Sequence, residues 1–151
     1  MQIDEMSEQE CSALLAGAYF GRLGCSLNDQ PYVVPICLAY EKGYFYALST
    51  LGQKIEWMRK NPKVCIQVDE ITSETRWASV IANGDFQELA EPRYADERAH
   101  ARKLLAARPQ WWRTPMAERQ LKKGDDLIAP ILFRVRVDSM SGLRAIDETT
   151  G

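Results

Sequence analysis

A succession of short apolar segments separated by turn residues constrains this chain more than any other feature. The segments are rich in β-branched and aromatic residues, and the clearest of them places Val64, Ile66 and Val68 on one face of a strand. The turn sequences Asn28-Asp29-Gln30-Pro31 and Glu41-Lys42-Gly43 join the first three segments, which predicts an antiparallel meander. Six strands are predicted in all, at 19–27, 32–40, 44–48, 63–69, 77–89 with a bend at Gly84, and 131–137.

Four further segments predict helices around these strands. Ser7 and Glu10 have the spacing of a capping box at the start of 7–16, and Pro62 ends 52–61 because proline cannot continue a helix. A stripe of apolar residues predicts a helix over 92–108, and Thr114-Pro115 predicts the start of a shorter one. Because tight turns join most strands, we expect a mainly β fold, a six-stranded antiparallel barrel with peripheral α-helices. It forms a single domain, 1–151, with a core at 17–90, a last strand at 130–138 and a helical segment at 92–123.

Charge and composition exclude several classes of protein. The 151 residues carry 19 Lys and Arg against 21 Asp and Glu, a net charge of -2, whereas general nucleic-acid binders are strongly basic. No apolar run approaches the roughly 20 residues that cross a bilayer, and the first ten residues are acidic, so we expect a cytoplasmic protein without a membrane partner. The four cysteines lack metal-ligand spacing and predict reduced thiols, and the single histidine, His100, cannot complete a zinc site.

One turn has the layout of an anion site. The familiar hydrolase, zinc-protease and nucleotide-binding motifs are absent, but Ser49 and Thr50 follow a predicted strand and precede a helix that begins near Gly52 and Lys54. The free N–H groups and dipole of a helix start attract phosphate, and a lysine adds a full positive charge. The alternative is that Ser49 or Thr50 is an ordinary N-cap and Lys54 a solvated residue.

The order and spacing of five short motifs resemble the pyridoxamine 5′-phosphate oxidase-like, FMN-binding split-barrel proteins, especially the short branch near the nitroimidazole-resistance flavoproteins. The resemblance covers roughly residues 7 to 90. The motifs that carry it are Gly21-Arg22-Leu23-Gly24, Pro31-Tyr32-Val33-Val34-Pro35-Ile36, Gly52-Gln53-Lys54, Asn61-Pro62-Lys63-Val64-Cys65, and Trp77-Ala78-Ser79-Val80-Ile81 with Gly84.

The resemblance implies a six-stranded split barrel that forms a homodimer, with one FMN in each of two clefts at the subunit interface. It places three residues along the isoalloxazine ring, four around the ribityl phosphate and two on a strand lining the cleft. These are Val34, Pro35 and Ile36; Ser49, Thr50, Gln53 and Lys54; and Trp77 and Ser79, respectively. The phosphate interpretation of the Lys54 turn gains support, because the phosphate of FMN needs what that turn offers.

Two departures from the family narrow the function. Ala47 stands where many nitroimidazole-resistance members carry a histidine, and the basic and aromatic C-terminal motif of the vitamin B6 oxidases is not found in 132–151. We therefore do not expect B6 oxidation. The leading hypothesis is an FMN-dependent oxidoreductase that passes electrons from a reduced nicotinamide to a small organic acceptor. The alternative is a non-catalytic protein that binds or stores a flavin, or haem, in the same cleft.

Three features stay open at the level of sequence. Trp111-Trp112 could cover the cleft or plug one end of the barrel. The segment 92–123 carries nine basic and three acidic residues, and it could attract an anionic substrate or serve as a solvated face. Arg22 could point into the cleft or pair with an acid across the sheet.

Overall fold

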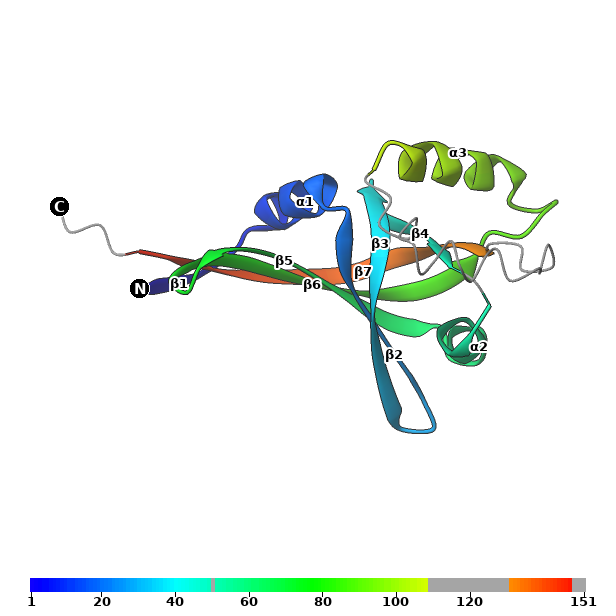
Figure 1. Cartoon of the computed structure of the whole chain (residues 1–151), viewed down its shortest axis with the longest axis horizontal. Helices are drawn as coiled ribbons and strands as arrows, with labels where there is room; N and C mark the ends of the chain where they lie inside the picture. Colours follow the sequence, from blue (N-terminus) through cyan, green and yellow to red (C-terminus); the bar gives the residue numbers. More distant parts are fainter. Residues whose placement is uncertain (50, 109–130, 148–151) are drawn as a thin grey trace, which may run out of the picture.

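The fold is a ring of six antiparallel strands with a seventh strand attached, seen in a computed structural model that describes residues 1–49, 51–108 and 131–147. Pairing runs in the order β1-β7-β4-β3-β2-β5-β6, and β6 also pairs with β7, which closes the ring (Figure 1). The predicted mainly β, six-stranded antiparallel barrel is confirmed. The strands are β1 (Gln2–Glu5), β2 (Phe20–Leu27), β3 (Gln30–Glu41), β4 (Tyr44–Ser49), β5 (Lys63–Ser73), β6 (Arg76–Glu88) and β7 (Ile131–Ile146).

Two tight turns build the meander that the sequence predicts. Asn28 and Asp29 have φ of 50° and 64°, and Lys42 and Gly43 have φ of 49° and 86°. Positive φ at both central residues is the geometry that matches the twist of hairpin strands, and asparagine, aspartate and glycine adopt it most readily. The β2–β3 hairpin therefore turns in two residues rather than the four predicted, and its tip projects beyond the rest of the sheet (Figure 1).

The far half of β7 is longer than predicted and pairs with a strand that the sequence did not reveal. β7 continues from Val137 to Ile146, where it pairs with β6 on one side and β1 on the other. The register shifts between Asn83 and Gly84, because these neighbours face Ser139 and Val137, so Asp138 is the extra residue of a bulge. A Cβ on Gly84 would lie 2.1 Å from the carbonyl oxygen of Arg136, so only glycine allows the two strands to come this close.

The described helices are α1 (Glu8–Gly17), α2 (Gln53–Lys60) and α3 (Ala95–Ala106). The predicted capping box at the start of α1 is confirmed, since Glu10 N donates to Ser7 Oγ and Ser7 N donates to Glu10 Oε1, each at 3.1 Å. α3 begins three residues later than predicted, because Pro92 lies in the preceding turn. The helix predicted after Thr114-Pro115 lies outside the described residues. No described helix is long and apolar enough to cross a membrane.

Side chains of alternate residues on each strand fill the barrel interior. They form one main apolar cluster, and a second, smaller cluster lies where α3 packs against β3 and β4. None of the four cysteines forms a disulfide, and burial raises the pKa of the Cys11 and Cys25 thiols. The interior is thus occupied by packed side chains, so the residues that could meet a ligand lie on the outer face of the sheet or at its ends.

Candidate functional site

The outer face of the barrel carries a polar row that crosses neighbouring strands. Pro35 on β3 lies opposite Arg22 on β2, and Arg22 lies opposite Gln67 on β5. Asp69, two residues along β5, lies opposite Ser79 on β6. Because every second residue of a strand points to the same face, these five residues share the outer face while their neighbours point inward.

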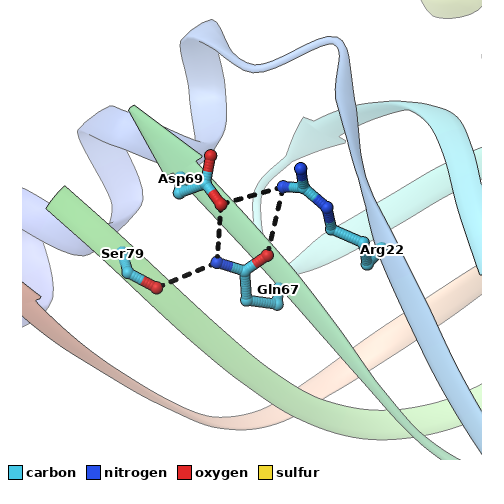
Figure 2. Close-up of polar contacts among 4 residues, drawn as sticks. All are labelled: Arg22, Gln67, Asp69 and Ser79. Carbon is cyan, nitrogen blue, oxygen red and sulfur yellow. Dashed lines mark hydrogen bonds and ion pairs between the residues drawn. The ribbon is translucent and has the colours of Figure 1, made fainter. Parts of the chain in front are cut away.

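Four of these residues form a connected hydrogen-bond network (Figure 2). Arg22 Nη1 donates to Asp69 Oδ2 at 2.8 Å and to Gln67 Oε1 at 3.3 Å. Gln67 Nε2 donates to Asp69 Oδ2 and to Ser79 Oγ, both at 3.0 Å. The side chains of Arg22 and Asp69 are 42% and 23% exposed, so the network is half open to solvent. Of the two orientations that the sequence left open for Arg22, the structure shows the pairing with an acid across the sheet.

Large apolar side chains surround this network on the same face. Val33 and Ile71 are 66% and 70% exposed, and Ile81 lies directly opposite Gln67. Leu143 on β7 lies opposite Ser79 and is also exposed. Exposed apolar groups gathered around a polar centre are typical of a surface that meets a ligand or another protein.

The second candidate region is the turn between β4 and α2. Gly52 is the N-cap of α2 and makes no side-chain cap hydrogen bond, so the alternative that Ser49 or Thr50 serves as its N-cap is wrong for Ser49. Ser49 is instead buried at the end of β4, and Gln53 is exposed in the first turn. Thr50 lies outside the described residues. Gly52 itself has no side chain to accept from the backbone N–H groups of this helix start, and such groups are a favourable place for an anion.

Lys54 is half-buried at this helix start. Burial lowers the pKa of its ammonium group, and the nearby thiol of Cys25 opposes that effect weakly. No carboxylate within 1–49, 51–108 or 131–147 forms an ion pair with it. A half-buried cation without an anionic partner is costly, and a bound anion would remove part of that cost.

The structure separates the three residues predicted to line an isoalloxazine ring. Val34 and Ile36 point into the barrel, where they pack with the main core, whereas Pro35 is exposed on the outer face. Trp77 and Ser79 are half-buried on that same outer face. Pro35, Trp77 and Ser79 thus share the outer face and a second group lies at the Lys54 turn, whereas the side chains of Val34 and Ile36 belong to neither group.

A cavity of about 420 Å³ lies on the outer face beside the polar network. Gly24, Val33 and Cys65 line its wall, and Asn83 and Asp138 lie at the bulge between β6 and β7. The absence of a side chain on Gly24 leaves space for the Cys65 thiol, because a Cβ there would lie 2.8 Å from Cys65 Sγ. No cluster of three or more metal-ligating His, Cys, Asp or Glu exists among the described residues.

Comparison with known proteins identifies the family. A family model described as pyridoxamine 5′-phosphate oxidase matches residues 7–144. The chain belongs to this family. A curated, uncharacterised protein of Rhizobium meliloti (strain 1021) is 40% identical to it over 146 residues, which is 96% of this chain and 97% of that protein.

Solved structures of similar proteins have the same fold. A FAD-binding protein of Mesorhizobium loti is 35% identical, with a TM-score of 0.80 over 97% of this chain and 100% of its own. A FAD-binding protein of Mycobacterium smegmatis is 18% identical, with a TM-score of 0.69 over 95% of this chain and all of its own. A candidate 5-nitroimidazole resistance protein of Bacteroides thetaiotaomicron is 22% identical, with a TM-score of 0.65 over 97% of this chain and 93% of its own. This member of the family therefore has a split-barrel fold, and proteins of similar structure include FAD-binding proteins.

Sequence analysis missed Gln67 and Asp69, which connect Arg22 to Ser79. Both lie in the alternating strand 63–69, where their outward direction is visible in the sequence, but an outward polar residue on a strand is usually only solvated. The signal that could have found them is their position on β5, which lies between β2 and β6, two strands that carry family motifs. Ala47 is buried in the barrel opposite Phe133, so its position offers no polar group to a ligand.

Proposed function

We propose that this protein binds FMN and transfers electrons from a reduced nicotinamide to a small organic acceptor. The single observation that carries the cofactor assignment is Lys54, a half-buried cation at the start of α2 that has no acidic partner among the described residues. A phosphate ester would give that ammonium group its counter-ion and could accept hydrogen bonds from backbone N–H groups of the first turn of the helix. The residues present therefore fit the phosphate end of a flavin mononucleotide.

The outer face supplies groups that suit the ring of the same cofactor. Pro35, Trp77 and the exposed apolar side chains offer flat, water-excluding contacts, and Arg22 and Gln67 offer polar groups for the edge of a heterocycle. A bound flavin supplies the redox chemistry, because it accepts a hydride and passes electrons on. The chain need only hold, orient and shield it, which agrees with the absence of a recognisable acid–base pair.

We further propose that two copies of the chain associate through the outer face. Val33, Ile71, Ile81 and Leu143 leave apolar area exposed around the polar network of each copy. A second copy would cover this area and exclude water from the network between them. A homodimer would thereby enclose the ligand surface that one chain leaves open.

The first experiment is the visible absorption spectrum of the purified protein, followed by acid release of any chromophore and its identification by mass. Released FMN would support the proposal. Released FAD would retain a flavin but contradict the mononucleotide, and a haem band or a colourless protein that takes up no added flavin would contradict the cofactor altogether. Addition of NADH or NADPH without oxygen then separates enzyme from storage protein, since rapid bleaching is expected of an oxidoreductase.

A cytoplasmic location is part of the same proposal. It is supported by the four cysteines, which form no disulfide. Cell fractionation with the tagged full chain would test it, and recovery in an extracytoplasmic or membrane fraction would contradict it.

A further inference from the structure

Among the described residues, the guanidinium group of Arg22 uses one of its three nitrogens for hydrogen bonds. Its hydrogen bonds to Gln67 and Asp69 both start from Nη1, and no bond from Nε or Nη2 to a described residue is present. The guanidinium carbon also lies 5.6 Å from the centre of the Phe20 ring, which further restrains the side chain. Arginine has five N–H donors, so a held but half-exposed Arg22 keeps donors available on the outer face.

The position of Arg22 connects it with the cofactor surface proposed above. It lies opposite Pro35 on one neighbouring strand and is joined through Gln67 to Ser79 on the other side. The family resemblance implies that Pro35 and Ser79 contact the cofactor, and both lie on the same face as Arg22. Arg22 is therefore the permanent positive charge in the middle of that surface, and Asp69 is the negative charge that partly balances it.

We propose that Arg22 makes a bound flavin easier to reduce and that Asp69 limits this effect, an inference that rests on the proposed function. A hydride brings two electrons and one proton from a reduced nicotinamide, so the cofactor gains one negative charge and the nicotinamide loses one hydride. A fixed cation nearby stabilises the more negative form, and a half-buried site weakens this interaction less than bulk water does. Arg22 acts here as a tuning residue through its charge, and Gln67 and Asp69 act as positioning residues that hold it.

The two charges predict effects of opposite sign. Removal of the positive charge in Arg22→Gln should lower the ratio of the affinity for reduced flavin to that for oxidised flavin. Removal of the opposing negative charge in Asp69→Asn should raise the same ratio, while the asparagine amide can still contact Arg22. A purely structural role for this pair would instead loosen the sheet in both variants and shift the ratio in the same direction or not at all.

The test is a redox titration of the bound flavin against a reference dye in the full-length protein, with unfolding measured in parallel. We expect at least a tenfold fall in the affinity ratio for Arg22→Gln, which is about 30 mV for a two-electron couple, and a rise for Asp69→Asn. Arg22→Lys keeps the charge and should recover most of the wild-type value. Arg59→Gln is the matched control, because Arg59 pairs with Glu88 at 2.6 Å with similar exposure on α2, and it should leave the potential unchanged.

The outcomes separate this inference from the proposed function. Wild-type protein that binds no flavin would overturn both. Wild-type protein that binds flavin, with potentials that do not move or that move in the same direction in Arg22→Gln and Asp69→Asn, would overturn only the role of Arg22 and Asp69. If Arg22→Gln fails to fold, the pair Asp69→Asn and Arg22→Lys decides, since a rise in the first and a near-wild-type value in the second are still required.

Discussion

Arg22 and Leu23 are consecutive on β2, yet they belong to regions with different tasks. Leu23 is fully buried and lies between Val34 and Ile66 of the two neighbouring strands on the inner face. Arg22 is 42% exposed on the outer face, within a network that is satisfied on one side and open on the other. We therefore expect the inner face to supply most of the stability of the barrel and the outer face to tolerate changes of charge.

The largest expected effect is on the inner face. Leu23→Ala removes buried methyl groups and leaves a cavity, and we expect it to lower the free energy of unfolding by about 3 kcal/mol or more. Arg22→Ala breaks one partly exposed ion pair and should cost about 1 kcal/mol or less. Urea unfolding of the flavin-free proteins measures both, and equal losses would show that the two faces do not divide stability and function in this way.

The next effect concerns the apolar part of the outer face. Val33→Asp places a carboxylate in the proposed contact between two copies, and burial of an unpaired charge is costly. We expect the dissociation constant of the dimer to rise at least a hundredfold, about 2.8 kcal/mol, with little change in the unfolding of each chain.

Sedimentation velocity over a range of concentrations measures this change. Val33→Thr is the control, because it keeps the shape of the side chain without adding charge. A wild-type protein that stays monomeric, or a Val33→Asp protein that dimerises as tightly as wild type, would contradict the proposed interface.

The repeated turns and the alternation of apolar residues made most of the barrel predictable. The pairs Asn28-Asp29 and Lys42-Gly43 suit two-residue hairpins, and Pro62 and Ser7 mark helix boundaries through well-understood local effects. β1 was missed because four residues with two acids carry too little alternation to be recognised. Its stability as a strand comes from pairing with β7, which is a contact between opposite ends of the sequence.

The candidate site was only partly predictable, because some of its contacts also join residues that are far apart in the sequence. Lys54 could be found from a local pattern, since a strand, a turn and a helix start follow one another in sequence. The Arg22 network joins strands that are distant along the chain, and its bonds depend on a register that local sequence does not encode. The contact of Val34, Pro35 and Ile36 with an isoalloxazine ring stays a prediction, and alternation along the strand leaves only the side chain of Pro35 on the outer face.

The contribution of the Lys54 turn to flavin binding can be measured by removing its single charge. Lys54→Ala should weaken flavin binding about tenfold, which is about 1.4 kcal/mol, because the phosphate loses its cation. Lys60→Ala is the control, since Lys60 is exposed at the other end of the same helix. Fluorescence titration of the flavin-free proteins measures the affinities, and unchanged binding in Lys54→Ala would remove this residue from the phosphate site.

The smallest expected effect is a dependence of flavin affinity on pH, which comes from Lys54 in the turn between β4 and α2. Burial lowers the pKa of Lys54 in the free protein, so this residue loses its charge at a lower pH than an exposed lysine. The phosphate favours the charged form, so binding takes up a proton once pH exceeds the pKa of free Lys54, and affinity falls as pH rises. The phosphate itself stays a dianion above about pH 7. We expect a loss smaller than that of Lys54→Ala as the pH rises from neutral toward the ordinary pKa of lysine, about 10.4. Lys54→Arg should bind with little dependence on pH, and an equal slope in both proteins would mean that another group titrates.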